Sequence, residues 1–477
     1  YTELLISKYI QNFYDYNIFG LIDTEDEFGE KLIKSFNVDN FFYYPNISIF
    51  QRCFFLLKAF KIINNLKTID QFINLSKGEV NFGRCVYDHL IRNTGIASFN
   101  KINFKFYFFL SDALFCNNFC INLFSKNKFE YMIMSETQFL PSNIIFQHAL
   151  KKKIKVISRV EGTKKIGITL VDSIKDKYTS NNKIKKSSIE KLYIEDRKLF
   201  SDKGLDAISK IFYNKTKHWD VFSNKNFIKS NNLNADDLYN FLNWNKSQKT
   251  CVIFGHNLLD GNYIESWRIF RDNLTWLRET LMFIKNLNPE INWLYKEHPS
   301  EYGLKFSHAI SSITVFNEII GSQDNIKIFP KKFNTILLKD VANCVLTSQG
   351  SAGIEYPCFG TPSITGGDSF YNGLGFSHNP ENKDQYFSLL ANMPKIASKK
   401  LTPDQVDLAR ISFYFYNKAT KLDHPLLDNY EITKESDFNI FFDKSIDLIS
   451  KYKEEDDIFK RRLKIQLENI DRHLTVI

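Results

Sequence analysis

The sequence has few of the features that would hold a chain in a membrane or cross-link it with disulfide bonds. Its most apolar window, Phe104–Phe124, is interrupted by Asp112, Asn117 and Asn118, which makes it a poor membrane span. Residues 1–10 have neither the basic start nor the cleavage site of a signal peptide, so none is predicted. The cysteines number seven and stand mostly inside apolar runs, which favours reduced core thiols and a cytoplasmic location.

Signatures of metal and nucleic-acid binding are also missing. Cys116 and Cys120 are spaced for one helical face, but no second ligand pair follows at metal-binding spacing, so no zinc site is predicted. No zinc-finger spacing, RNA-binding aromatic signature or basic zipper is found, so no nucleic-acid partner is expected. The net charge of +9 instead favours phosphorylated substrates, anionic glycans or the inner face of a membrane, or is a solvated basic surface. Peripheral contact with the cytoplasmic membrane therefore stays open.

The length and composition indicate a globular protein of more than one domain. A chain of 477 residues is too long for one ordinary core, and 43% hydrophobic with 25% charged residues excludes disorder on a large scale. We predict an N-terminal domain at residues 1–240, a second domain at 241–400 and C-terminal helices at 401–477. The Asn-rich segment Ser223–Ser247 is the predicted linker.

Apolar runs and helical patterns alternate through the second half of the chain. The predicted strands are Cys251–Phe254, Ile291–Tyr295, Ile326–Phe329, Cys344–Thr347 and Ser363–Thr365. The helices predicted between them are a stripe from Trp267 to Ile284, then Ser307–Ile320, Asn334–Lys339 and a helix that opens near Ala352. This alternation predicts an α/β fold with a doubly wound parallel sheet, which binds ligands at the carboxyl ends of its strands. The first half shows one such unit, with a strand at Tyr131–Met134, a helix at Ser142–Lys151 and a strand at Ile154–Ser158.

A histidine motif follows the predicted strand Ile291–Tyr295. His298 stands at the carboxyl end of that strand, and Pro299 stiffens the turn. An imidazole there can bind a phosphate oxygen and neutralise a leaving group, and Lys296 adds a positive charge. The alternative is a histidine in an ordinary turn.

A loop of small residues, Thr347–Glu355, follows the strand Cys344–Thr347. Small residues let a backbone approach a ligand closely, and a helix that opens here would direct free N–H groups at an anion. The alternative is a helix start capped by a serine. Because this loop and His298 lie at the same edge of the predicted sheet, they favour one anionic ligand. The residues predicted to bind it here are Ser348, Gln349, Gly350, Ser351, Gly353 and Glu355, the last by accepting from ribose hydroxyls.

Two further loops carry polar residues beside the predicted site. The loop Gly255–Gly261 contains His256 and Asp260, which either contact a substrate or belong to an interdomain turn. Asp368 follows Gly366 and Gly367 in a loop whose glycines are more typical of a structural role than of catalysis. We predict His256, Asp260 and Asp368 as substrate-binding residues.

These motifs resemble those of bacterial capsule and surface-polysaccharide glycosyltransferases, including the Kdo- and sialic-acid-type transferases that use CMP-activated ulosonic acids. The resemblance covers residues 245–385 and rests on the loop Gly255–Gly261, the Trp276 helix, the His298 motif and the Ser348–Glu355 loop with Gly360-Thr361-Pro362. It implies a GT-B fold, in which two Rossmann-like domains face a cleft and the C-terminal one binds the nucleotide. It also implies that His298, Ser348 and Ser351 bind the nucleotide phosphate, and that Phe329 and Pro330 lie near the base.

The resemblance further implies that the N-terminal domain holds the acceptor and a catalytic carboxylate. Glu136 follows the predicted strand Tyr131–Met134 and is the residue we predict as general base, acting with His298. Its alternative is a carboxylate that stabilises a helix start. No DxD motif stands at a strand end of the second domain, so neither a metal nor a cofactor is expected beside the nucleotide-sugar donor.

Three other functions stay open at this point. One is a CDP-alcohol glycerophosphotransferase, which also carries a His-Pro motif. The second is a UDP-sugar epimerase or transferase of the same fold. The third is a glycan-binding scaffold without turnover.

Overall fold

The computed structural model describes residues 2–160, 165–179, 183–213, 233–262, 269–287, 289–302, 309–424 and 458–473, with the single residues 447 and 475. Contacts within the chain divide it into two compact units. Unit 1 comprises Tyr1–Val86, Ile102–Lys177 and Ala419–Ile477, and unit 2 comprises Tyr87–Lys101 and Tyr178–Lys418. The sequence predicts divisions at residues 240 and 400 instead. The units depart from those ranges because the chain passes between them several times, which a linear division cannot represent.

Unit 2 is built on a six-stranded sheet in which every neighbouring pair is parallel. Its strands, in spatial order, are β10 (Ile326–Ile328), β9 (Ile291–Lys296), β8 (Lys249–Phe254), β11 (Cys344–Thr347), β12 (Ser363–Thr365) and β13 (Ser377–His378). The predicted α/β class is confirmed, and so is each predicted strand of this sheet to within two residues. These strands are apolar runs because parallel strands in such a sheet are covered on both faces.

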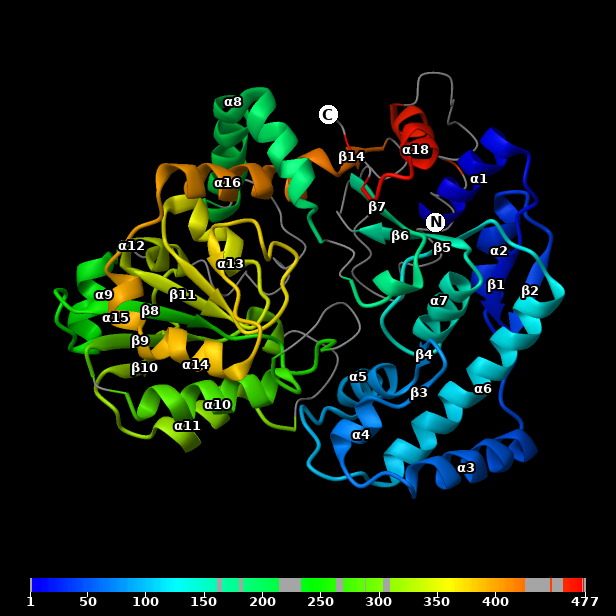
Figure 1. Ribbon diagram of the computed structural model, residues 1–477, viewed down its shortest axis with the longest axis horizontal. Helices are drawn as coiled ribbons and strands as arrows, with labels where there is room; N and C mark the ends of the chain where they lie inside the picture. The colour runs from blue at the N-terminus through cyan, green and yellow to red at the C-terminus, as the bar shows by residue number, and fades with distance from the viewer. Residues whose placement is uncertain are drawn as a thin grey trace. The chain divides into compact units, whose positions relative to one another are not determined.

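Helices cover both faces of this sheet (Figure 1). The helices α10 and α14 pack together on one face, where the rings of Phe283 and Phe387 stack at 4.6 Å, while α12 and α13 share a core cluster on the other. The helices of unit 2 are α8 (Lys186–Phe212), α9 (Ala235–Leu242), α10 (Asn273–Lys285), α11 (Ser312–Ile320), α12 (Leu338–Val341), α13 (Ala352–Glu355), α14 (Lys383–Ala391), α15 (Met393–Ala397) and α16 (Pro403–Tyr414).

Three of the sequence predictions for this unit need correction at their ends. Helix α10 begins at Asn273, because the Asp272 side chain accepts from the Thr275 N–H at 2.7 Å and caps the helix there. Of the earlier part of the predicted stripe, Phe270 lies before the helix, and Trp267 lies outside the described residues. Helix α11 begins at Ser312. Its predicted first residue, Ser307, lies outside the described residues. Of the predicted linker, residues 223–232 lie outside the described ranges, and α9 occupies much of the rest.

Unit 1 contains smaller sheets than unit 2. The predicted strand–helix–strand unit is confirmed as β5 (Tyr131–Met134), α7 (Ser142–Lys151) and β6 (Lys155–Val160), with β5 and β6 parallel. Strands β7 (Lys165–Val171) and β14 (Leu422–Asp423) extend this sheet in antiparallel pairs. The remaining strands are β1 (Gly20–Asp23) and β2 (Phe41–Tyr44), which pair in parallel, and β3 (Ser76–Lys77) and β4 (Val80–Asn81).

The helices of unit 1 surround these sheets (Figure 1). They are α1 (Thr2–Tyr14), α2 (Glu27–Ser35), α3 (Ile49–Ile63), α4 (Ile69–Ile73), α6 (Phe104–Lys126), α7 and α18 (Ile458–Asn469), while α5 (Gly83–Thr94) is divided between the two units after Val86. Among the described helices, none combines the length and the apolar character that a bilayer span requires. Six of the seven cysteines are buried and all are free, as the sequence predicted for core thiols, and Cys53 on α3 is exposed.

Candidate functional site

The register of the unit 2 sheet aligns the ends of three central strands. Phe254 of β8 is paired with Lys296 of β9 on one side and with Thr347 of β11 on the other. The three strands therefore end at the same level of the sheet, and a loop follows each of them. Their first residues are Gly255, Glu297 and Ser348, so the histidine motif and the small-residue loop share one sheet edge, separated by the loop after β8.

Two histidines meet at this edge. The ring centroids of His256 and His298 are 6.0 Å apart, with the ring planes at 60°. The Nε2 atom of His256 lies 3.7 Å from a carboxylate oxygen of Asp260, and Arg92 lies 3.9 Å from the other oxygen. The sequence pointed to each histidine separately, and the structure brings them into contact.

Lys296 secures the turn that carries His298. Its ammonium donates to the backbone oxygen of Glu297 at 2.8 Å, and the residue is only 7% exposed. Burial lowers the pKa of Lys296 to about 8, against the opposing effect of Glu297. Lys331 adds an ion pair to the Glu297 carboxylate at 3.5 Å. Lys296 is thus a buried member of the turn, whereas the sequence suggested a charge directed at the ligand.

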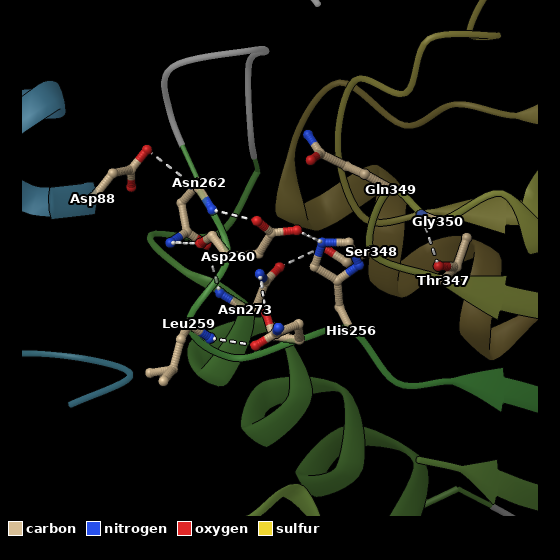
Figure 2. Close-up of polar contacts among 12 residues, drawn as sticks. Asp88, His256, Leu259, Asp260, Asn262, Asn273, Thr347, Ser348, Gln349 and Gly350 are labelled. Carbon is tan, nitrogen blue, oxygen red and sulfur yellow. Dashed lines mark hydrogen bonds and ion pairs between the residues drawn. The ribbon is translucent and has the colours of Figure 1, made fainter. Parts of the chain in front are cut away.

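Asn273 joins the loop after β11 to the loop after β8. Its side-chain oxygen accepts from the Ser348 hydroxyl at 3.1 Å, and its side-chain nitrogen donates to the backbone oxygen of Asn257 at 3.0 Å. Its backbone N–H donates to the side-chain oxygen of Asn262, also at 3.0 Å. Figure 2 shows Asn273 between Asn262 and Ser348. The Ser348 hydrogen is used within the protein, so Ser348 acts here as a positioning group rather than as the free donor that the sequence suggested.

The glycines of the Thr347–Glu355 loop are required by the protein's own packing. A Cβ atom on Gly353 would lie 1.9 Å from the Tyr371 hydroxyl, which donates to the backbone oxygen of Gly350 at 2.8 Å. The Gly350 N–H donates to the Thr347 hydroxyl at 3.0 Å. The sequence attributed these small residues to a close approach by a ligand, but at Gly353 it is Tyr371 that approaches.

The helix expected to bind an anion is short. Helix α13 has four residues, Ala352–Glu355, and Pro357–Phe359 follows it as a 3₁₀ turn. Such a single turn has little of the aligned dipole of a long helix. Ser351 is exposed and makes no side-chain cap, and Glu355 is half-buried. The start of α13 therefore offers an anion a weaker dipole than the sequence predicted.

Two other residues predicted to contact the ligand, Asp368 and Phe329, have partners within the protein. The Asp368 carboxylate pairs with Lys183, and Gln349 donates to the Asp368 backbone oxygen at 3.2 Å. Phe329 is 5% exposed within a core cluster of unit 2, and its N–H donates to the Tyr295 oxygen at 2.8 Å. The Phe329 side chain is thus committed to the core and not to a nucleotide base, while Pro330 beside it is half-buried.

Glu136 lies in unit 1, at a cavity of about 860 Å³. Strands β1 and β5 both line this cavity, and so do the acidic residues Asp23 and Asp26 and the aromatic residue Tyr44. The Glu136 carboxylate is exposed and accepts from the N–H groups of Gln138 and Phe139. It therefore stabilises the turn before α7, as the alternative reading held, and it also borders the cavity.

The sequence did not identify the buried groups that support the unit 2 loops. Asp272 accepts from the Tyr87 hydroxyl at 2.7 Å. The pKa of Tyr87 is raised well above its usual range, mainly by burial and in addition by the negative charge of Asp272. Asp88 is fully buried and accepts from the Asn262 N–H at 2.8 Å. The pair Asp272-Asn273 before an apolar stripe is a helix-start signal. The partners in α5 are 174 and 185 residues away in sequence, so no local pattern indicates them.

Within the described ranges, no group of three or more His, Cys, Asp or Glu side chains is arranged to hold a metal ion.

No protein-family model matches the chain, and no curated protein matches it either. The chain matches several solved structures weakly. Among them is the β Kdo 2,7 transferase of KpsC from Thermosulfurimonas dismutans, with 14% identity, 69% of this chain and 89% of that one covered, and a TM-score of 0.34. The β Kdo 2,4 transferase of the same KpsC gives 11% identity, coverage of 59% and 78%, and a TM-score of 0.34. The UDP-GlcNAc 2-epimerase from Neisseria meningitidis, bound to UDP-GlcNAc, gives 11% identity, coverage of 86% and 92%, and a TM-score of 0.25. The functional assignment therefore rests on the residues of this chain.

Proposed function

We propose that this protein is a metal-independent GT-B glycosyltransferase that binds a nucleotide-activated sugar at the carboxyl edge of the unit 2 sheet. The donor we propose is a CMP-linked ulosonic acid such as Kdo or a sialic-acid-like sugar, and the acceptor a bacterial surface glycan or glycoconjugate. One observation carries the proposal: the aligned ends of β8, β9 and β11 hold His256, His298 and the Ser348 loop at one edge.

The chemistry of this edge suits an anionic leaving group. Imidazole N–H groups and the exposed Ser351 hydroxyl can donate to phosphate oxygens, and a protonated imidazole adds charge. The supporting bonds of Asn273 and Tyr371 fix the loop before the ligand arrives, which reduces the cost of reorganisation during reaction. Removal of one such preorganised donor typically costs about 3 kcal/mol of transition-state stabilisation.

In the proposed reaction, an acceptor hydroxyl gives its proton to Glu136 as its oxygen bonds to the anomeric carbon of the donor. The bond from that carbon to the nucleotide phosphate breaks, and the nucleotide leaves with the bonding electrons. The unit 1 cavity supports an acceptor role for this region, because carboxylates accept from sugar hydroxyls and aromatic faces pack on sugar rings. The Glu136 side chain is exposed at that cavity and is able to exchange a proton.

Titration calorimetry with CMP, CDP, UDP and GDP tests the donor assignment. We expect CMP to bind most tightly. A preference for CDP would indicate the glycerophosphotransferase, and a preference for UDP the epimerase or a hexose transferase. Absence of binding to all four nucleotides would indicate the glycan-binding scaffold.

The substitution His298→Ala tests whether binding takes place at the proposed edge. A hydrogen bond to a charged group contributes about 1.5–3 kcal/mol, so the affinity should fall roughly 10- to 100-fold. His378→Ala is the matched control, because His378 is an exposed histidine on β13 at the far side of the same sheet. Equal effects of the two substitutions would contradict the proposed site.

A further inference from the structure

Helix α3 of unit 1 presents large apolar side chains to solvent. Phe50 is 89% exposed and Ile49 is 80% exposed, and Phe54, Leu57 and Phe60 are all more than half exposed. Residues at positions 50, 54 and 57 share one helical face, because residues three and four apart lie above one another. The opposite side of α3 is the buried one, at Phe55, Ala59 and Ile63. The helix is therefore apolar on both sides.

Helix α6 continues this apolar surface. Phe104 at its first position is 77% exposed, and Phe108, one turn later, is 44% exposed. The two helices are in contact: the guanidinium of Arg52 lies 4.4 Å from the Phe108 ring centroid, and the rings of Phe60 and Tyr107 are 6.0 Å apart. Figure 1 shows α3 beside the first turns of α6. We call the exposed residues of these two helices the α3 face: Ile49, Phe50, Phe54, Leu57, Phe60, Phe104 and Phe108.

The charged residues of helix α3 are all basic. Helix α3 contains Arg52, Lys58 and Lys61 and no acidic residue. The Lys58 ammonium lies 4.1 Å from the Phe54 ring centroid, so the cation stands next to the exposed aromatic side chain. Asp112 of α6 is the nearby acid, and Arg52 pairs with it. Basic side chains thus remain to face a partner of negative charge.

We propose that the α3 face docks this protein onto a membrane surface rich in anionic phospholipid. Contiguous exposed apolar patches mark sites of interaction, and aromatic and leucine side chains with flanking Lys and Arg are the composition of helices that lie in a bilayer interface. The basic residues select the anionic surface over a second copy of this chain, whose α3 face would carry the same charge. The proposal concerns unit 1 alone and does not depend on the donor nucleotide.

Flotation with lipid vesicles tests this assignment with the intact chain. We expect the protein to float with vesicles of phosphatidylcholine and phosphatidylglycerol and to float poorly with phosphatidylcholine alone. Phe50→Ser with Leu57→Ser should reduce the bound fraction about tenfold or more, because apolar burial anchors the helix. Lys58→Gln with Lys61→Gln should weaken vesicle binding about 30-fold, since each of the two basic residues contributes about 1 kcal/mol near such a surface. Added salt should weaken vesicle binding by the wild type more than vesicle binding by the lysine variant.

A matched substitution controls for the loss of any exposed apolar residue. Ile194 on α8 is 83% exposed, and Ile194→Ser should leave vesicle binding unchanged. Circular dichroism of each variant reports whether unit 1 remains folded. Cys53 offers a local readout, because it is exposed on α3 while the other cysteines are buried. An environment-sensitive dye on Cys53 should shift its emission to the blue when anionic vesicles are added.

Three results would overturn the proposal. One is absence of flotation with anionic vesicles. Another is flotation that the α3 substitutions do not change and that leaves the dye on Cys53 unshifted, which would place the lipid contact elsewhere. The third is a dimer, seen by analytical ultracentrifugation, that Phe50→Ser with Leu57→Ser dissociates while vesicle binding is absent. That result would assign the α3 face to a second copy of the chain.

Discussion

The side-chain oxygen of Asn273 accepts a hydrogen bond from the Ser348 hydroxyl at 3.1 Å, although the two residues are 75 positions apart in the chain. Both are buried, at 0% and 1% exposure. Asn273 also donates to the Asn257 backbone, so one side chain fixes two of the loops at the proposed nucleotide site. The position of Ser348 therefore depends on helix α10 as well as on its own strand.

We predict that Asn273→Ala lowers both stability and nucleotide affinity. The substitution leaves the Ser348 hydroxyl and the Asn257 oxygen buried without this partner, which should reduce the free energy of unfolding by about 2 kcal/mol. Urea unfolding measures that loss, and calorimetry should show nucleotide affinity reduced by about tenfold as the Ser348 loop loosens. Asn286→Ala is the control, because Asn286 is an exposed asparagine at the other end of α10. Unchanged affinity in a folded Asn273→Ala protein would mean that this bond does not support the site.

Glu136→Gln should remove turnover and leave nucleotide binding near normal. The glutamine side-chain oxygen can still accept from the Gln138 and Phe139 N–H groups, so the turn before α7 is retained while the base is lost. General base catalysis typically contributes 10²- to 10⁴-fold, and a sugar-transfer assay with the preferred donor should show a loss of about that size. Glu130→Gln, at an acid that lines the same cavity, is the control. Wild-type activity in Glu136→Gln would reject this residue as the base.

Gly353→Ala should destabilise unit 2 through a steric clash with Tyr371. The added Cβ atom would lie 1.9 Å from the Tyr371 hydroxyl and 2.7 Å from its ring carbon, so α13 or the tyrosine must move. Overpacking of this kind costs about 1–3 kcal/mol, measurable by urea unfolding. The double variant with Tyr371→Phe removes the closest atom and should recover part of the loss, although the bond to the Gly350 oxygen goes with it. A folded, fully stable Gly353→Ala protein would show that this approach is not a constraint.

Lys296→Met should stabilise the protein near neutral pH, and the gain should disappear in alkali. Burial lowers the pKa of Lys296 to about 8 in the folded state, below the ordinary lysine value of 10.5. The unfolded chain then binds more protons than the folded one between those two values, so this group makes stability rise with pH across that window. Below pH 8 the lysine is charged in both states, and the lowered pKa then corresponds to a loss of about 3 kcal/mol from the free energy of unfolding.

Unfolding of wild type and Lys296→Met at a series of pH values measures this difference. The two stability curves should converge as pH rises from 8 toward 10.5, because the buried wild-type lysine becomes neutral in both states. Lys285→Met, at an exposed lysine at the end of α10, should show no such convergence. A constant difference between wild type and Lys296→Met over this window would refute the pKa assignment.

The strands of unit 2 could be predicted because each is an apolar run between helical patterns. The clearest case is β11, predicted at Cys344–Thr347 and found there. Strands of a parallel sheet that is covered on both faces are buried on both sides and are therefore apolar throughout, so the local composition predicts them. The first residue of α10 could not be predicted from the apolar stripe, because the start at Asn273 is set by a cap and not by periodicity.

The division of the chain was beyond a linear prediction. Residues 87–101 belong to unit 2 and residues from 419 onward to unit 1, although the neighbouring segments belong to the other unit. Composition changes at a linker mark a boundary only where the chain crosses once. The α3 face was missed for a related reason, since a Phe-rich helix is predicted as buried until its neighbours are known.

The sequence by itself determined that the second half forms a parallel α/β sheet and that His298 and the Ser348 loop follow strand ends. Only the tertiary structure decided that β8 lies between those strands, so that His256 contacts His298 and Asn273 holds Ser348. It also decided that Phe329, Gly353 and Lys296 serve packing or the turn itself. Local composition records whether a residue will be buried. Which partner it meets depends on contacts between segments far apart in the chain, and those are set when the whole unit packs.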